Sequence, residues 1–165
     1  MIRYTGHYIT FQEVPNMVSL VLTISGCQRN CVGCHSPWLR DPDMGCDLEE
    51  MLPGLLDRYG DGINCVCFMG EGRDSYAFER CVKMVQKRKL KTCLYSGADS
   101  LDELPSIVKS MHFIKLGHYE AALGGLNSPT TNQRMYKNFG AYCRPYKYDL
   151  VDVTKSWFQR EYKEL

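Results

Sequence analysis

The stretch MVSLVLTISGCQRNCVGC, residues 17–34, decides how this chain can fold. Its first half, residues 17–25, is an almost unbroken apolar and β-branched run, which predicts a strand buried on both faces. Cys27, Cys31 and Cys34 follow almost at once with the spacing CxxxCxxC. A buried strand that runs directly into a cysteine-rich loop places metal-ligand chemistry at the carboxyl end of a sheet strand, where ligands of α/β proteins bind.

Strand and helix patterns alternate downstream of this loop. The expected strands are residues 17–25, 64–69, 91–95 and 111–116, with a weaker one near 148–153. The first expected helix is residues 47–60, with Asp47 and Glu50 as a capping pair. The second is capped by Asp74 and has the apolar stripe Ala77, Phe78, Cys81, Val82 and Val85. The third is a short helix at 101–110 that is broken near Pro105. This alternation favours right-handed βαβ units, and therefore an α/β fold with a mostly parallel sheet. A closed eight-unit barrel needs about 250 residues, so we expect a truncated, open partial (βα) barrel.

The composition fits one globular domain. The 165 residues are 44% apolar and 24% charged, without a repeated or biased segment. We expect a core of about residues 17–136 and an aromatic-rich C-terminal extension, residues 137–165. The aromatic residues of this end of the chain either close the core or dock a partner: Tyr136, Phe139, Tyr142, Tyr146, Tyr148, Trp157 and Phe158.

Net charge and cysteine content indicate which partners and which cellular compartment to expect. A formal net charge of +1 gives no strong field toward nucleic acid or a membrane, so neither is expected as a partner. No secretory signal is visible, and no apolar run approaches the ~18 residues of a spanning helix, so we expect a cytoplasmic protein. Nine cysteines in a reducing compartment favour metal binding or catalysis over a disulfide framework.

The three clustered cysteines suit a 4Fe-4S cluster, because thiolates are the usual ligands of such clusters. Three ligands for four irons leave one iron open, as catalytic zinc keeps a free position, and an open iron can chelate the amino and carboxylate groups of a methionine moiety. The alternative is a non-enzymatic zinc or iron–sulfur module, with Cys46 or His35 as the fourth zinc ligand. The remaining cysteines lack ligand spacing and are expected to be small core residues: Cys46, Cys65, Cys67, Cys81, Cys93 and Cys143.

The CxxxCxxC motif after the first buried strand resembles the radical S-adenosylmethionine (radical SAM) enzymes. The following CHSPWL, residues 34–39, is similar to the glycyl-radical activases within that family. The resemblance implies the family's partial barrel and a 4Fe-4S cluster bound by the three cysteines. It also implies that Gly33, Cys34 and His35 lie against S-adenosyl-L-methionine.

A second segment, FMGE at residues 68–71, stands at the place of the family's Gly-Gly-Asp/Glu motif. There, backbone at the strand end receives the methionyl ammonium, which implies cofactor contacts for Gly70 and Glu71. Met69 departs from the first glycine of the motif. Without the resemblance, the same residues are more typical of a turn.

Two further segments point to a subfamily. Residues 95–97 (YSG) resemble the Tyr/Trp-Thr-Gly of the activases of anaerobic ribonucleotide reductase, which makes Ser96 a candidate ligand contact. Residues 123–134 (LGGLNSPTTNQR) are similar to that subfamily's Gly-Ser-Ser-Asn-Gln segment. The implied partner is the large subunit of an anaerobic (class III) ribonucleoside-triphosphate reductase.

The resemblance implies a radical reaction. A flavodoxin-like donor would supply one electron, and S-adenosylmethionine would be cleaved to methionine and a 5'-deoxyadenosyl radical, which takes a hydrogen from a glycine of the reductase. Such a radical must be kept from solvent, so an open half-barrel needs a partner to close it. A radical SAM activase of another glycyl-radical enzyme is the alternative within the family.

Overall fold

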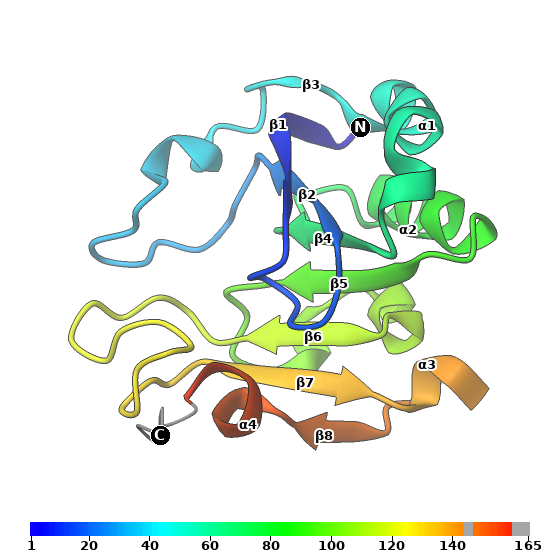
Figure 1. The fold of residues 1–165 in the computed structure, drawn as a ribbon. Helices are drawn as coiled ribbons and strands as arrows, with labels where there is room; N and C mark the ends of the chain where they lie inside the picture. The colour runs from blue at the N-terminus through cyan, green and yellow to red at the C-terminus, as the bar shows by residue number, and fades with distance from the viewer. Residues whose placement is uncertain (144–146, 160–165) are drawn as a thin grey trace.

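The structure is a computed structural model that describes residues 1–143 and 147–159, and it shows an α/β fold built on a mixed eight-stranded sheet. The strand order is β3-β1-β2-β4-β5-β6-β7-β8 (Figure 1). The strands are β1 (Arg3–Thr10), β2 (Ser19–Ile24), β3 (Cys46–Asp47), β4 (Cys65–Met69), β5 (Lys91–Tyr95), β6 (Phe113–Leu116), β7 (Arg134–Asn138) and β8 (Leu150–Asp152). The helices are α1 (Leu48–Tyr59), α2 (Ser75–Lys87), α3 (Gly140–Cys143) and α4 (Thr154–Phe158), with 3-10 helices η1 (Pro37–Arg40), η2 (Gly60–Gly62), η3 (Leu101–Glu103) and η4 (Ser106–Ser110).

The centre of the sheet is parallel. Strands β2, β4, β5 and β6 run in one direction, which confirms the four strands expected from apolar runs. The weaker strand expected near residues 148–153 is β8, and it pairs antiparallel with β7. The sequence patterns did not indicate β1, β3 or β7, which add antiparallel pairs at both flanks of the parallel centre.

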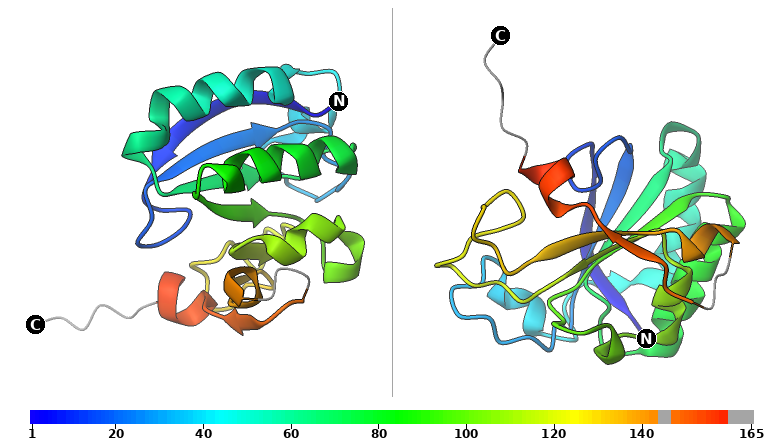
Figure 2. Two further views of the ribbon diagram at one scale, coloured as in Figure 1. Left: turned by 90° about the vertical axis from the view of Figure 1, so that its right-hand side faces the viewer. Right: turned by 90° about the horizontal axis from the view of Figure 1, so that it is seen from below.

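Helices α1 and α2 lie side by side over one face of the sheet (Figure 2). Asp74 caps α2 by accepting a hydrogen bond from the Ala77 N–H at 2.9 Å, and Asp47 caps α1 in the same way. The expected apolar stripe of α2 is fully buried, with the Phe78 ring edge-on to Phe68 of β4 at 5.4 Å. The expected helix at 101–110 is two 3-10 helices, η3 and η4, separated at Pro105, which cannot continue a helix.

A second core covers the opposite face of the sheet. Cys65, Cys67 and Cys93 lie there against Phe113, and Trp157 of α4 packs on the Phe113 ring at 5.7 Å. The expectation of buried cysteines is confirmed for these three and for Cys81 of α2. It is wrong for two others, which are exposed because they lie on short edge elements: Cys46 at the start of β3 and Cys143 at the end of α3.

The aromatic residues near the C-terminus divide between core and surface. Tyr136 and Tyr148 pack against the helix-side core, and Trp157 and Phe158 pack against the opposite core. Two others are exposed, Phe139 at 41% and Tyr142 at 46%, and Tyr146 lies outside the described residues. Within the part of the chain that the structure describes, no helix is both long enough and apolar enough to cross a membrane.

Candidate functional site

A cavity of about 680 Å³ lies at the carboxyl ends of the parallel strands, where α/β sheets bind ligands. In Figure 1 the arrowheads of β4, β5 and β6 point toward this side of the molecule. We call it the strand-end cavity. Its lining includes five residues singled out by three separate motifs: Cys27, Cys34, Gly70, Glu71 and Ser96. Positions far apart in the sequence therefore meet at one site.

The cysteine loop, residues 25–36, turns tightly between its second and third thiol. The Cys34 N–H donates to the Cys31 carbonyl at 3.3 Å, and the Ser36 N–H points at the Cys34 sulfur at 3.4 Å. Gly33 makes this turn with a φ of +73°, a left-handed conformation that L side chains rarely adopt. Backbone N–H groups directed at sulfur are a means by which proteins tune iron–sulfur ligands.

Arginine side chains hold this loop in place. Arg40 donates to the Cys31 carbonyl at 3.1 Å, while Arg73 donates to the Gly26 carbonyl at 3.4 Å and to the Arg40 carbonyl at 3.2 Å. Arg73 belongs to the segment after β4, so the loop is attached to the edge of the sheet that carries the Gly-Glu motif.

The three thiols are not gathered around one point. Cys27 and Cys34 line the strand-end cavity, whereas Cys31 lines a neighbouring cavity of about 660 Å³, which we call the loop cavity. Over residues 1–143 and 147–159, no group of three His, Cys, Asp or Glu side chains is arranged to hold a metal ion. The donor set nevertheless fits a cluster in kind, because three partly exposed cysteines share one short loop, and metal loops often reach their final geometry only on binding.

Glu71 is a partly buried carboxyl group that follows β4. Its Oε1 accepts a hydrogen bond from the Ser96 hydroxyl at 2.9 Å and lies 3.7 Å from the Arg29 guanidinium. Burial raises the pKa of Glu71, and the contacts with Ser96 and Arg29 oppose that rise. The preceding Gly70 has a φ of +107°, so a left-handed backbone without a side chain faces the cavity.

Lys115, near the end of β6, is a cation that the sequence analysis did not single out. Only 8% of Lys115 is exposed, and its Nζ donates to the Gly117 carbonyl at 2.8 Å and to the Ser96 carbonyl at 3.5 Å. Burial lowers its pKa to about 8. It also lines the strand-end cavity, which therefore contains a partly buried acidic residue and a buried basic one. A lysine inside the apolar run MHFIKL was the available signal.

The remaining candidates lie beside the cavities. His35 contacts Tyr119, with Nε2 3.1 Å from the tyrosine hydroxyl and the ring centroids 4.7 Å apart. Neither His35 nor Gly33 is among the residues that line the two cavities. Cys46, an alternative zinc ligand, pairs with Tyr4 of β1 at the edge of the sheet.

Comparisons with protein-family models, with curated proteins and with solved structures find no match for this chain. The family resemblance therefore rests on the motifs themselves. The geometry adds that residues of three of these motifs line a common cavity at the carboxyl ends of the parallel strands.

Proposed function

We propose that this chain is a radical SAM enzyme that activates an anaerobic ribonucleoside-triphosphate reductase by generating its glycyl radical in the cytoplasm. The observation that carries the proposal is the convergence of the cysteine loop, Gly70-Glu71 and Ser96 on the strand-end cavity. The parallel strands β2, β4, β5 and β6 would be the retained part of a truncated (βα) barrel.

Cys27, Cys31 and Cys34 are the residues that would hold a 4Fe-4S cluster. A cluster with three thiolate ligands supplies an open iron and the electron that cleaves S-adenosyl-L-methionine reductively to a 5'-deoxyadenosyl radical. The chain contributes the positioning of the loop, since Arg40 and Arg73 fix its carbonyl groups. The three thiols do not form a ligand group in the described structure, so binding a cluster would require side chains of the loop to rearrange.

Glu71 and Lys115 suit the zwitterionic end of a methionyl group. The carboxylate of Glu71 can accept from the ligand ammonium, and the ammonium of Lys115 can donate to the ligand carboxylate. Both groups are costly to bury without a counter-charge, and a ligand that carries both charges relieves that cost. Ser96 orients Glu71 by its hydrogen bond, and Gly70 lets the ligand approach the backbone.

The partners follow from the chemistry. The strand-end cavity is open to the surface, so a radical formed there needs a macromolecular substrate to exclude water. On this proposal the substrate is the glycine-bearing segment of the large reductase subunit, and a flavodoxin-like protein supplies the electron. No general acid or base is required of the chain, which agrees with a site built from binding groups.

The test is an anaerobic reconstitution of the full chain with iron and sulfide, followed by metal analysis. Addition of dithionite and S-adenosylmethionine should release 5'-deoxyadenosine, and addition of the reductase should produce a glycyl-radical doublet in electron paramagnetic resonance. Cleavage without the doublet would indicate another glycyl-radical partner. A chain that takes up zinc or iron and never consumes S-adenosylmethionine would be a metal module, and the proposal would be wrong.

A matched pair of variants tests the site itself. Glu71→Gln retains the size of the side chain and an oxygen for Ser96 but removes the charge. We expect it to weaken S-adenosylmethionine binding by about tenfold, the scale of one charge-assisted hydrogen bond. Glu79→Gln, which removes an exposed ion pair with Lys83 on α2, should leave the affinity unchanged.

A further inference from the structure

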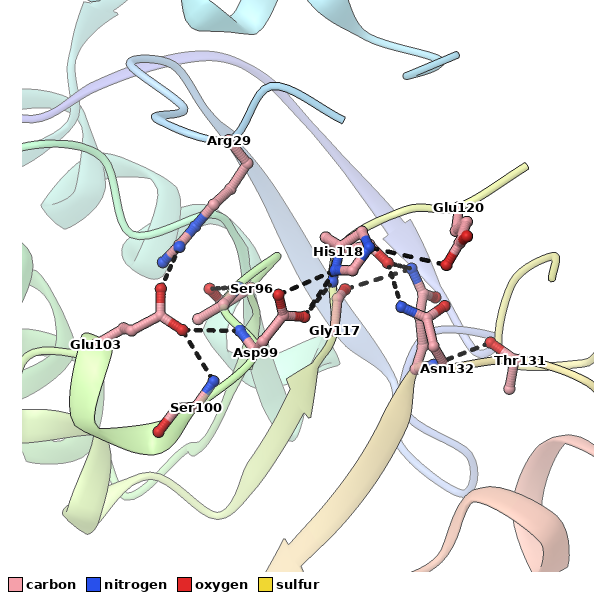
Figure 3. A network of polar contacts seen from close by, with 12 residues as sticks. Arg29, Ser96, Asp99, Ser100, Glu103, Gly117, His118, Glu120, Thr131 and Asn132 are labelled. Atoms are coloured by element: carbon pink, nitrogen blue, oxygen red, sulfur yellow. Dashed lines mark hydrogen bonds and ion pairs between the residues drawn. The ribbon is translucent and has the colours of Figure 1, made fainter. Parts of the chain in front are cut away.

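Within the CxxxCxxC segment of the described structure, Arg29 is the one residue whose side chain contacts two acidic side chains from other parts of the fold. It lies between Cys27 and Cys31, and its guanidinium is bonded to Glu103 of η3 (Figure 3). The same guanidinium lies 3.7 Å from the Glu71 carboxylate. Arg29 and Glu103 are separated by 74 residues in the sequence. The contact therefore ties the cysteine loop to the segments that follow β4 and β5.

Glu103 is itself held firmly, which makes it a fixed anchor for Arg29. Its Oε1 accepts from the backbone N–H of Asp99 at 3.0 Å and of Ser100 at 2.9 Å, while Oε2 receives Arg29 (Figure 3). Ser100 completes a capping box with Glu103 at the start of η3. One carboxyl group thus joins the loop after β5 to the cysteine loop.

Arg29 also forms part of the wall between the two cavities. It lines both of them, as does Gly97. The stem of Arg29 passes so close to Gly97 that a Cβ there would meet the Arg29 Cγ at 3.0 Å. A side chain at position 97 would push the arginine away, so the glycine permits the close approach. Loss of Arg29 would open the strand-end cavity toward the loop cavity.

We propose that Arg29 is a positioning residue that fixes the cysteine loop on the ends of β4 and β5 and separates the two cavities. Its effect on cofactor chemistry rests on the proposed function, but its effect on the loop does not. Two carboxyl groups receive the planar guanidinium at once, a geometry that the single ammonium of lysine cannot reproduce in full.

The decisive experiment is hydrogen–deuterium exchange of the metal-free full chain under reducing conditions. Arg29→Gln should increase the exchange rate of residues 27–34 by about tenfold, which corresponds to about 1.4 kcal/mol. Arg29→Lys should restore part of the protection. The control is Arg80→Gln, which removes an exposed arginine–glutamate pair with Glu49 between α1 and α2; it should leave this segment unchanged.

A double-mutant cycle shows whether Arg29 holds the cysteine loop through its contact with Glu103. Glu103→Gln should increase exchange of residues 27–34 as Arg29→Gln does, and the double variant should exchange no faster than either single variant. Unchanged exchange in Arg29→Gln, or an equal increase in Arg80→Gln, would overturn the proposal. Additive effects of the two substitutions would also contradict it.

The reconstituted protein gives a second readout. In Arg29→Gln the yield of 5'-deoxyadenosine per glycyl radical should rise, because a more open site would admit a thiol reductant from the buffer, whose weak S–H bond can give a hydrogen atom to the radical in place of the glycine. An unchanged ratio would contradict the separating role. If the wild-type chain consumes no S-adenosylmethionine, the proposed function fails, while the exchange comparison still decides whether Arg29 positions the loop.

Discussion

Replacing Lys115 by methionine tests whether this buried cation is retained for a ligand. Burial lowers the pKa of Lys115 from 10.5 to about 8. Because the folded pKa lies below the unfolded value, the unfolded chain binds more protons between these two pH values. The stability of the wild type therefore rises with pH through this window. Below pH 8 the folded protein bears the full cost of a buried charge.

The pKa difference sets the size of the effect. A shift from 10.5 to about 8 corresponds to about 3 kcal/mol, at about 1.36 kcal/mol per pKa unit. Methionine has a similar length, but it removes the donor to the Gly117 and Ser96 carbonyl groups, at about 1 kcal/mol each. Near neutral pH we expect Lys115→Met to raise the free energy of unfolding by about 1 kcal/mol, or the melting temperature by about 2–4 °C.

Urea unfolding followed by circular dichroism measures this difference, at pH about 7 and again at pH about 10. At the higher pH the wild type no longer carries the charge, so the variant should become the less stable protein. Lys87→Met, at the exposed end of α2, is the control and should show no such crossover. A Lys115→Met protein that is destabilised equally at both pH values would refute the reasoning. With the cofactor, the same variant should bind S-adenosylmethionine more weakly than the wild type.

Three other outcomes are expected. Cys31→Ala should leave the metal-free chain folded, since Cys31 is partly exposed, but it should abolish the intact cluster and all cofactor cleavage. The control Cys46→Ala should retain full iron content on metal analysis. Gly70→Ala forces a side chain into a φ of +107° and should lower the free energy of unfolding by about 1–3 kcal/mol in thermal denaturation. Burial lowers the pKa of His112 from 6.5 to about 4, so stability should be lost as pH falls through this window, and His112→Gln should flatten that dependence in urea titrations.

The parallel centre of the fold was predictable because each of its strands is a short apolar run. Strand β1, with the sequence RYTGHYIT, exposes half of its residues and carries no such run. Strand β7, with the sequence RMYKN, is also polar, and its pairing with β6 and β8 makes it a strand. Such strands are determined by the neighbours with which they pair, which a local pattern does not contain.

The candidate site, like the fold, contains some residues that could be predicted from the sequence and others that could not. Gly70, Glu71 and Ser96 could be identified because each lies at the end of a recognisable strand, and parallel strands bring their ends together. Arg29 and Glu103 were missed, since their contact joins positions 74 residues apart. The pattern that marked Cys46 as a core residue failed for a related reason, because its burial depends on what covers β3.

The placement of the three cysteines argues that the loop completes its geometry when metal binds. Cys27 and Cys34 already line the strand-end cavity, and only Cys31 lines the loop cavity. Arg40 holds the carbonyl group of Cys31 through a hydrogen bond that does not involve the Cys31 side chain. On the proposed function, rotation of side chains on this anchored loop would be a route to a three-thiolate site, and it would need no rearrangement of the sheet.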